Sequence, residues 1–421
     1  MMQTNTRLRC ALLGAALLLA QAAGAQTATA PLPAASAEAA PTLGREIGLL
    51  LQDAQRLLVE GKGSAAADKL RAAEAVANRT PYEQYVLARL ALALAGLNGD
   101  AERAAQQFEL ASLGPWLAQA DKLSAMQTVA SLYYNAKQYA QAIEWAKRYQ
   151  QAGGLDASVN TMLMQSHYLS ADYASAAKAL QTEVDKALAA GKAPSEIHLR
   201  MLADSQGRLK DEAGYSRGLE ALVQYYPSPE SWRMLLARLW AKPQLAPRLH
   251  LHLLRLQLAS AGLGEASDYS EMAELALQEG SAIEASQLLE QGFSSGALAA
   301  TDRVLKALRD KMGAAAAQDR KTLEADLLRA RSMPDGLGLF NYGFSLFHSG
   351  QGERGLAQME QALAKGIARN ADLARLRLVA AYAQAKQRDK AIQVLSALAG
   401  KGDLVGYEEI VRYWKLLLRQ P

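Results

Sequence analysis

The chain has 421 residues, of which 50% are hydrophobic and 6% aromatic, and a formal net charge of +4 at pH 7. This charge is too small to imply a nucleic acid or a membrane surface as the partner. Its alanine and leucine richness is typical of all-α packing.

Residues 1–25 have the pattern of a secretory signal peptide. Arg7 and Arg9 precede an apolar run, and Ala23-Gly24-Ala25 supplies the small residues of a cleavage site before Gln26. We therefore expect a periplasmic protein; an uncleaved signal that anchors the chain to the inner membrane is the alternative. Cleavage removes two arginines and no acidic residue, so the formal net charge falls from +4 to +2. It also removes Cys10, the single cysteine. The mature chain then has no disulfide and no thiolate site.

Residues 26–42 are rich in Ala, Pro, Ser and Thr, which predicts a flexible linker. Beyond it, the segments 126–154 and 160–188 each contain two amphipathic helical stretches separated by a short polar turn. Residues of the first recur in the second at a displacement of 34: Tyr133, Tyr134, Tyr139 and Ala142 become His167, Tyr168, Tyr173 and Ala176. A unit repeated at a fixed period cannot bury its apolar face alone, so it stacks on its copies.

This pattern resembles the tetratricopeptide-repeat family, whose unit is a 34-residue helix–turn–helix. The resemblance implies an all-α fold, an α-α superhelix that is a solenoid of stacked hairpins. We expect N-terminal repeats over 43–225 and C-terminal repeats over 266–400. Small residues where two helices cross allow their backbones to approach closely. The pairs Ala273 with Ala285 and Gly343 with Gly355 suit such crossings.

The segment 226–265 departs from the repeat, because Pro243 and Pro247 stop a helix from continuing. The stretch that follows alternates apolar and polar residues, which alone suggests a strand. No pairing strand is visible, so we favour a buried helix that faces both neighbouring repeats. Its two faces are Leu249, Leu253 and Leu256, and Leu251, Leu254 and Leu258.

Two further segments are interpreted from spacing and amphipathicity. Ala285 and Gly355 are 70 residues apart, twice a repeat length, so residues 301–331 are expected to form one degenerate helix pair. Residues 401–421 are expected to form a terminal helix that covers the open end of the solenoid, with Tyr407 and Trp414 on its apolar side.

Catalytic and metal-binding patterns are not apparent. His250 and His252 are two residues apart, which places them on different faces of a helix, and His167 occupies a packing position of the repeat. No nucleophile elbow or phosphate-binding loop occurs. We therefore expect no enzyme activity, no cofactor and no metal.

In the resembled family the first helix of each repeat lines a concave groove that contacts a ligand peptide. Carried over by repeat alignment, the candidate groove residues are Tyr134, Asn135, Gln165, Tyr168, Glu274, Phe340, Phe344, Phe347 and His348. Members of this family that bind the terminal carboxylate of a partner peptide use Lys, Arg and Asn at the groove positions. This chain has other residues there, which argues against binding through a terminal carboxylate.

Three of the five phenylalanines, Phe340, Phe344 and Phe347, follow i, i+4, i+7 spacing. In one interpretation they form an aromatic strip in the groove that anchors a partner. In the alternative, which we favour, the strip packs under the next repeat or the terminal helix.

Residues 268–298 and 314–333 are similar to a family of secreted bacterial tetratricopeptide-repeat proteins that share the stretch Gln318–Leu323. The resemblance implies a non-catalytic scaffold of the bacterial cell envelope that binds a partner peptide or helix in its groove. The alternatives are a self-associating accessory subunit of an envelope complex, which would be a homo-oligomer, or an enzyme with an unrecognised site. TonB-type energy transduction, export and assembly complexes are candidates by analogy.

Overall fold

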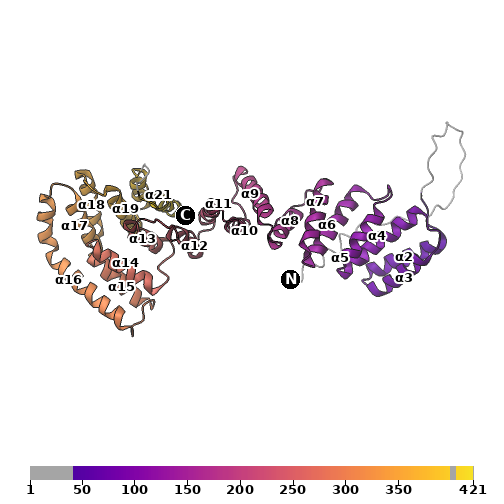
Figure 1. Cartoon of the computed structure of the whole chain (residues 1–421), viewed down its shortest axis with the longest axis horizontal. Coiled ribbons are helices and arrows are strands. Elements are labelled where there is room, and N and C mark those ends of the chain that lie inside the picture. The colour runs from indigo at the N-terminus through magenta and orange to yellow at the C-terminus, as the bar shows by residue number, and fades with distance from the viewer. Residues whose placement is uncertain (1–40, 399–403, 421) are drawn as a thin grey trace, which may run out of the picture. The chain divides into compact units, whose positions relative to one another are not determined.

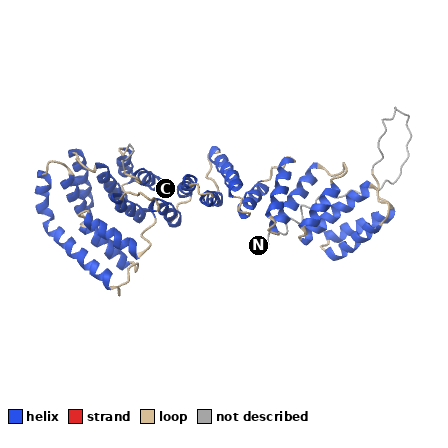
Figure 2. Ribbon diagram, viewed as in Figure 1, coloured by secondary structure: helices blue, strands red, loops and turns tan. Residues whose placement is uncertain are grey.

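The computed structural model describes residues 41–398 and 404–420, and in these ranges every regular element is a helix (Figure 2). The described residues divide into two compact units, one ending at Leu180 and the other beginning at Gln181. The predicted signal segment 1–25 and most of the linker lie outside the described residues. The prediction of an all-α chain of stacked helix pairs is confirmed.

The first unit consists of consecutive antiparallel helix pairs. The helices are α2 (Arg45–Val59), α3 (Gly63–Ala75), α4 (Pro81–Asn98), α5 (Ala101–Ala111), α6 (Gln119–Asn135), α7 (Tyr139–Gln151) and α8 (Ala157–Leu169), followed by α9 (Tyr173–Ala189), which contains the boundary between the units. Each first helix contacts its partner and the first helix of the next pair, as α4 does with α5 and α6 (Figure 1).

The second unit combines hairpins with single helices. Its elements are α10 (Glu196–Arg208), α11 (Glu212–Tyr225), α12 (Pro229–Trp240), the 3₁₀ turn η1 (Pro247–Leu249), α13 (His250–Ser260), α14 (Ala266–Gln278), α15 (Ala282–Ser294), α16 (Arg303–Ser332), α17 (Leu337–His348), α18 (Gly352–Lys365), α19 (Ala371–Gln384), α20 (Arg388–Ser396) and α21 (Tyr407–Arg419). Its hairpins are α10–α11, α14–α15, α17–α18 and α19–α20.

One turn geometry joins the two helices of every hairpin. A residue with positive φ stands two positions before the second helix; these residues are Gly61, Gly99, Lys137, Ala171, Lys210, Gly280, Gly350 and Lys386. The N–H of the next residue donates to a carbonyl five residues back, at 2.8–3.1 Å from nitrogen to oxygen. This is the Schellman motif, which satisfies carbonyls that a helix end leaves free. Half of these turns use a residue other than glycine, so the turn was not evident as a glycine pattern.

The predicted small residues do lie where helices cross. Ala273 and Ala285 are fully buried. A Cβ on Gly343 would lie 2.8 Å from the carbonyl oxygen of Gly355, and a Cβ on Gly355 would lie 2.5 Å from the backbone nitrogen of Phe347. Neither glycine of this pair therefore leaves room for a side chain, and α17 packs directly on the backbone of α18.

Helix α13 is the buried helix expected from residues 249–258. Leu253 and Leu256 pack into one core cluster, and Leu251 and Leu254 pack into another around α14 and α15. Its alternating sequence results from burial on most sides rather than from a strand.

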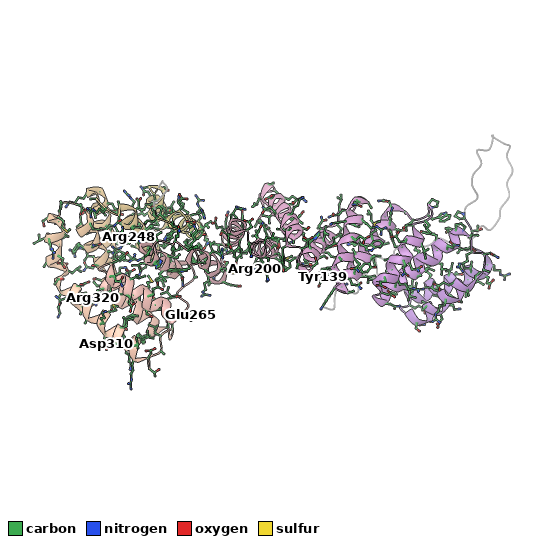
Figure 3. All side chains as sticks on the ribbon, viewed as in Figure 1. Tyr139, Arg200, Arg248, Glu265, Asp310 and Arg320 are labelled. Carbon is green, nitrogen blue, oxygen red and sulfur yellow. The ribbon has the colours of Figure 1, made fainter. Side chains whose placement is uncertain are left out.

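Residues 301–331 are not a helix pair, and that expectation is wrong. They form most of α16, a continuous 30-residue helix that lies along α15 and α17 (Figure 1). No residue inside α16 has positive φ, and the run Ala314–Ala317 strongly favours helix. Asp302 begins the helix by accepting hydrogen bonds from the N–H groups of Val304 and Leu305. Its exposed outer side carries Asp310 and Arg320 (Figure 3).

The terminal helix α21 buries Tyr407 and Trp414, as expected. It contacts α20 and also α11 and α13, which are far away in the sequence. Lys242 pairs with Glu409, and Arg412 pairs with Glu220 at 2.8 Å. Helix α21 thus joins the end of the second unit to its beginning.

The turn motif generates a stability prediction. Ala171 adopts φ +62°, a left-handed conformation that costs a side-chain-bearing residue about 1 kcal/mol. Ala171→Gly should raise the free energy of unfolding by about this amount, measured by urea denaturation.

Ala152 is the matched control, because it ends α7 with φ −79°. Ala152→Gly should lower stability slightly. A loss of stability in Ala171→Gly equal to that of the control would contradict the interpretation.

Candidate functional site

The first helices of the first unit are tied together by a row of polar contacts. Arg89 pairs with Asp121 at 3.5 Å between α4 and α6. The Nε2 of Gln127 donates to the Oγ of Ser158 at 3.2 Å, linking α6 to α8. We call these four residues, together with Tyr134 and Gln165, the polar row. It holds three successive first helices in register, so the surface that they present is preformed.

Tyr134 and Gln165, both predicted groove residues, are brought together in this row. The hydroxyl of Tyr134 donates to Oε1 of Gln165 at 2.9 Å. Burial raises the pKa of Tyr134, so the hydroxyl remains a donor at neutral pH. The Tyr134 ring also packs edge-on against Tyr139, at 5.9 Å between centroids.

The neighbouring predicted residues differ in exposure. Tyr168 is half-buried and packs on Tyr173 at 5.8 Å, repeating the Tyr134–Tyr139 contact one repeat later. The position of Tyr139 is labelled in Figure 3. Asn135 is exposed at the end of α6. This end of α6 therefore offers an amide to a partner beside a fixed aromatic pair.

The predicted residues of α17 do not form an exposed strip. Phe340 is 0% exposed and Phe344 is 2% exposed, while Phe347 is half-buried and His348 is buried. The groove-facing interpretation of Phe340 and Phe344 is therefore wrong, and the packed alternative holds. Glu274 is exposed on α14, away from these residues in the sequence.

Phe344 is buried because two arginines cover it. The guanidinium carbon of Arg377 lies 4.2 Å from the centre of the Phe344 ring, and that of Arg255 lies 5.3 Å from it. Both arginines are themselves buried, on α19 and α13. Cation–π contacts of this kind are strongest where water is excluded.

The charge of Arg255 is balanced inside the same cluster. Its Nε and Nη2 donate to both carboxylate oxygens of Glu284 at 2.8 and 2.7 Å. Its Nη1 lies 3.4 Å from Oε2 of Glu279. Burial raises the pKa of Glu284, but the attraction of Arg255 outweighs it and lowers that pKa to about 2. The carboxylate is therefore ionised at neutral pH.

Arg377 has mostly neutral partners. It donates to Oγ of Ser281 at 2.9 Å and to Oδ1 of Asn341 at 3.1 Å, and its Nε lies 3.9 Å from Glu279. Burial and the like charge of Arg255 lower the pKa of Arg377 to about 10. It still carries its charge at neutral pH.

The two buried histidines of this region are neutral. Burial lowers the pKa of His348 to about 4, and Nδ1 of His348 lies 2.9 Å from Oε1 of Gln287. Burial, with Arg255 and Arg377 nearby, lowers the pKa of His252 well below its usual range.

Arg255, Glu284 and Arg377 were not identified from the sequence. Arg255 is the only Asp, Glu, Lys or Arg in the leucine-rich α13, which is the signal that would have found it. Glu284 and Arg377 share their helices with other charged residues, so the sequence does not single them out.

A cavity of about 890 Å³ opens beside this cluster, and Arg255, Glu284, Phe344 and His348 form part of its lining. Among the described residues, no group of three or more His, Cys, Asp or Glu is placed to bind a metal. Within the same ranges, no helix is long and apolar enough to cross a bilayer.

The buried ion pair generates a stability prediction. Arg255→Met leaves Glu284 as a buried carboxylate without its main partner, which should cost about 3–5 kcal/mol in the free energy of unfolding. Arg309 and Glu290 form an equally bidentate but exposed pair, at 2.6 and 2.6 Å, so Arg309→Met should lower the free energy of unfolding much less than Arg255→Met does. Urea denaturation measures both. An equal loss in the free energy of unfolding for the two variants would show that burial does not make the Arg255–Glu284 pair more important to stability than the exposed pair.

The neutral histidines predict a dependence of stability on pH. The folded-state pKa of His348 is below its unfolded value near 6.5, so its contribution is present above pH 6.5 and is lost as pH falls toward 4. His252 acts in the same direction. Between pH 7 and pH 5 the contribution of His348 to the unfolding free energy should fall by on the order of 1–2 kcal/mol. His348→Gln should show a smaller fall than the wild type in urea titrations at the two pH values. An unchanged fall would contradict the assignment to His348.

No family model matches the chain, and no curated protein matches it. Among solved structures it is similar to the pentatricopeptide repeat protein PPR10 from maize, with 12% identity, 88% of this chain and 61% of that chain covered, and a TM-score of 0.29. It is similar to Naa15/Naa10 bound to HypK-THB, with 14% identity, coverage of 85% and 64%, and a TM-score of 0.28. It is also similar to yeast Tom70, with 11% identity, coverage of 88% and 95%, and a TM-score of 0.24.

The chain spans less than two thirds of the length of PPR10 and of the Naa15/Naa10 chain. These are helical-repeat proteins of the tetratricopeptide or pentatricopeptide type. Because all three TM-scores are below 0.5, the fold assignment rests on the chain's own hairpins.

Proposed function

We propose that the protein is a non-catalytic interaction scaffold of the bacterial cell envelope, which binds a peptide or helix of a partner protein on the first-helix face of its first unit. The observation that carries this proposal is the polar row. Contacts from Arg89 to Asp121, from Gln127 to Ser158 and from Tyr134 to Gln165 hold α4, α6 and α8 in register. A surface that is ordered before binding loses less entropy when a partner docks.

The chemistry of this face suits a peptide partner. Its side chains are mainly amides, hydroxyls and tyrosine rings, which can hydrogen-bond a peptide backbone and stack on its side chains. The Arg89–Asp121 pair is internally balanced, so charge attraction is not the main source of affinity. The envelope location rests on the signal pattern of residues 1–25.

The proposal predicts a position-specific crosslink in the native cell. A photoreactive residue in place of Asn135 should capture one recurrent envelope protein, identified by mass spectrometry. The protein itself should be in the periplasmic fraction and begin at Gln26. Asn135 is exposed, so the replacement should not disturb packing.

Lys147 is the matched control position, since it is exposed on the second helix α7 rather than on a first helix. Capture from 135 but not from 147 would support the first-helix face as the binding surface. Crosslinks confined to this chain or to a second copy would overturn the proposal in favour of self-association. A cytoplasmic chain that retains residues 1–25 would overturn the envelope location.

A further inference from the structure

The cavity of the second unit has the dimensions of a ligand site. Its volume of about 890 Å³ lies within the range of about 300–1,000 Å³ that is usual for small-molecule pockets. Its lining comes from α13, α14, α15, α17, α19 and α21, from the turn before α20 and the first residue of α20, and from Gln420 after α21. These segments are far apart in sequence, and all of them belong to the second unit.

The polar groups at the floor of the cavity already have partners. Arg255 and Glu284 satisfy each other through two hydrogen bonds. Gln287 and His348 do so as well, because Nε2 of Gln287 donates to the backbone oxygen of His348 at 2.6 Å while its Oε1 lies 2.9 Å from Nδ1. The floor is therefore fixed in place and has no net charge.

The remaining lining separates into an apolar wall and a basic mouth. Leu258 and Leu417 are half-buried and contribute apolar surface, whereas Met272, Leu288 and Phe344 also line the cavity but are each at most 4% exposed. Such a wall favours an occupant with an apolar body over water.

Lys386 and Arg388 stand at the mouth, and Glu284, the only acid among the lining residues, is already neutralised by Arg255. Lys386 has no ion pair with any residue in the described ranges, and it is held in the hairpin turn with φ +58°. The Nε of Arg388 donates to the backbone oxygen of Leu418, which fixes its guanidinium beside α21. Two cations without an opposing carboxylate thus lie next to an apolar wall.

We propose that this cavity binds an amphiphilic organic anion, whose carboxylate or sulfonate head lies at Lys386 and Arg388 and whose apolar body lies against Leu258 and Leu417. The cavity does not include the first-helix face of the first unit. The proposal of a ligand site therefore does not depend on the proposed scaffold function.

Isothermal titration calorimetry with dodecanoate below its micellar concentration tests the proposal on the full-length mature chain. Dodecanoate should bind at least tenfold more tightly than dodecyltrimethylammonium, which has the same apolar chain and a cationic head. Absence of dodecanoate binding, or equal binding of the two probes, would overturn the proposal. The same titration is made with an apolar hexapeptide that has a free terminal carboxylate. If this peptide binds tenfold more tightly than dodecanoate, the cavity is a site for a peptide end, and the proposal of a small-molecule ligand is overturned.

Two variants locate the binding. Lys386→Glu should weaken dodecanoate binding about fivefold or more, because it replaces an attraction at the mouth with a repulsion. Ala259→Trp, at an exposed position of the lining, should place an indole ring in the cavity and weaken dodecanoate binding about fivefold or more.

Lys210→Glu is the matched control. Lys210 occupies the same left-handed turn position in the α10–α11 hairpin, with φ +60°, and does not line the cavity. It should leave the affinity unchanged. Thermal melting by circular dichroism confirms that each variant is folded. An unchanged affinity in folded Ala259→Trp would place the probe elsewhere on the surface and overturn the proposal.

Discussion

The close antiparallel approach of two helices across a left-handed turn is the constraint on which both units depend. The turn reverses the chain in a few residues, and the N–H that follows it satisfies a free carbonyl of the helix just ended. The second helix then returns within reach of small residues, as at Gly343 and Gly355. Because each hairpin is built in this way, successive first helices lie side by side, and the polar row of the first unit follows from that arrangement.

In the second unit, buried charge is added to this plan. Arg255, Arg377 and Glu284 lie where hydrophobic residues would give a simpler core, and removing charges from water is costly unless they are paired. Pairing and stacking on Phe344 offset that cost. The cluster connects α13, α15, α17 and α19, elements that are not consecutive in the chain. Its specific geometry determines how the unit folds back and leaves the cavity beside it.

The terminal helix α21 also holds the second unit in its folded-back arrangement. A solenoid end normally needs a helix with one polar face. Here the helix also contacts α11 and α13. Its Arg412 pairs with Glu220 of α11, and its Glu409 pairs with Lys242 in the loop after α12. Lys386 and Arg388 lie near its end because α20 contacts α21. The basic mouth of the cavity is thus a consequence of tertiary closure.

The sequence by itself determined the repeat, because apolar spacing and small crossing residues are local patterns that recur at a fixed period. It also determined that residues 249–258 form a helix buried on two faces. It did not show that residues 301–331 are one helix. The spacing of 70 residues between Ala285 and Gly355 fits two repeat lengths whether or not the segment between them contains a turn. Nor could it decide whether Phe340 and Phe344 face the groove or the core. That depended on Arg255 and Arg377, which are 89 and 33 residues away from Phe344 in the sequence. Only the tertiary structure brings these side chains together, because burial and charge pairing are set by contacts between elements that no local pattern records.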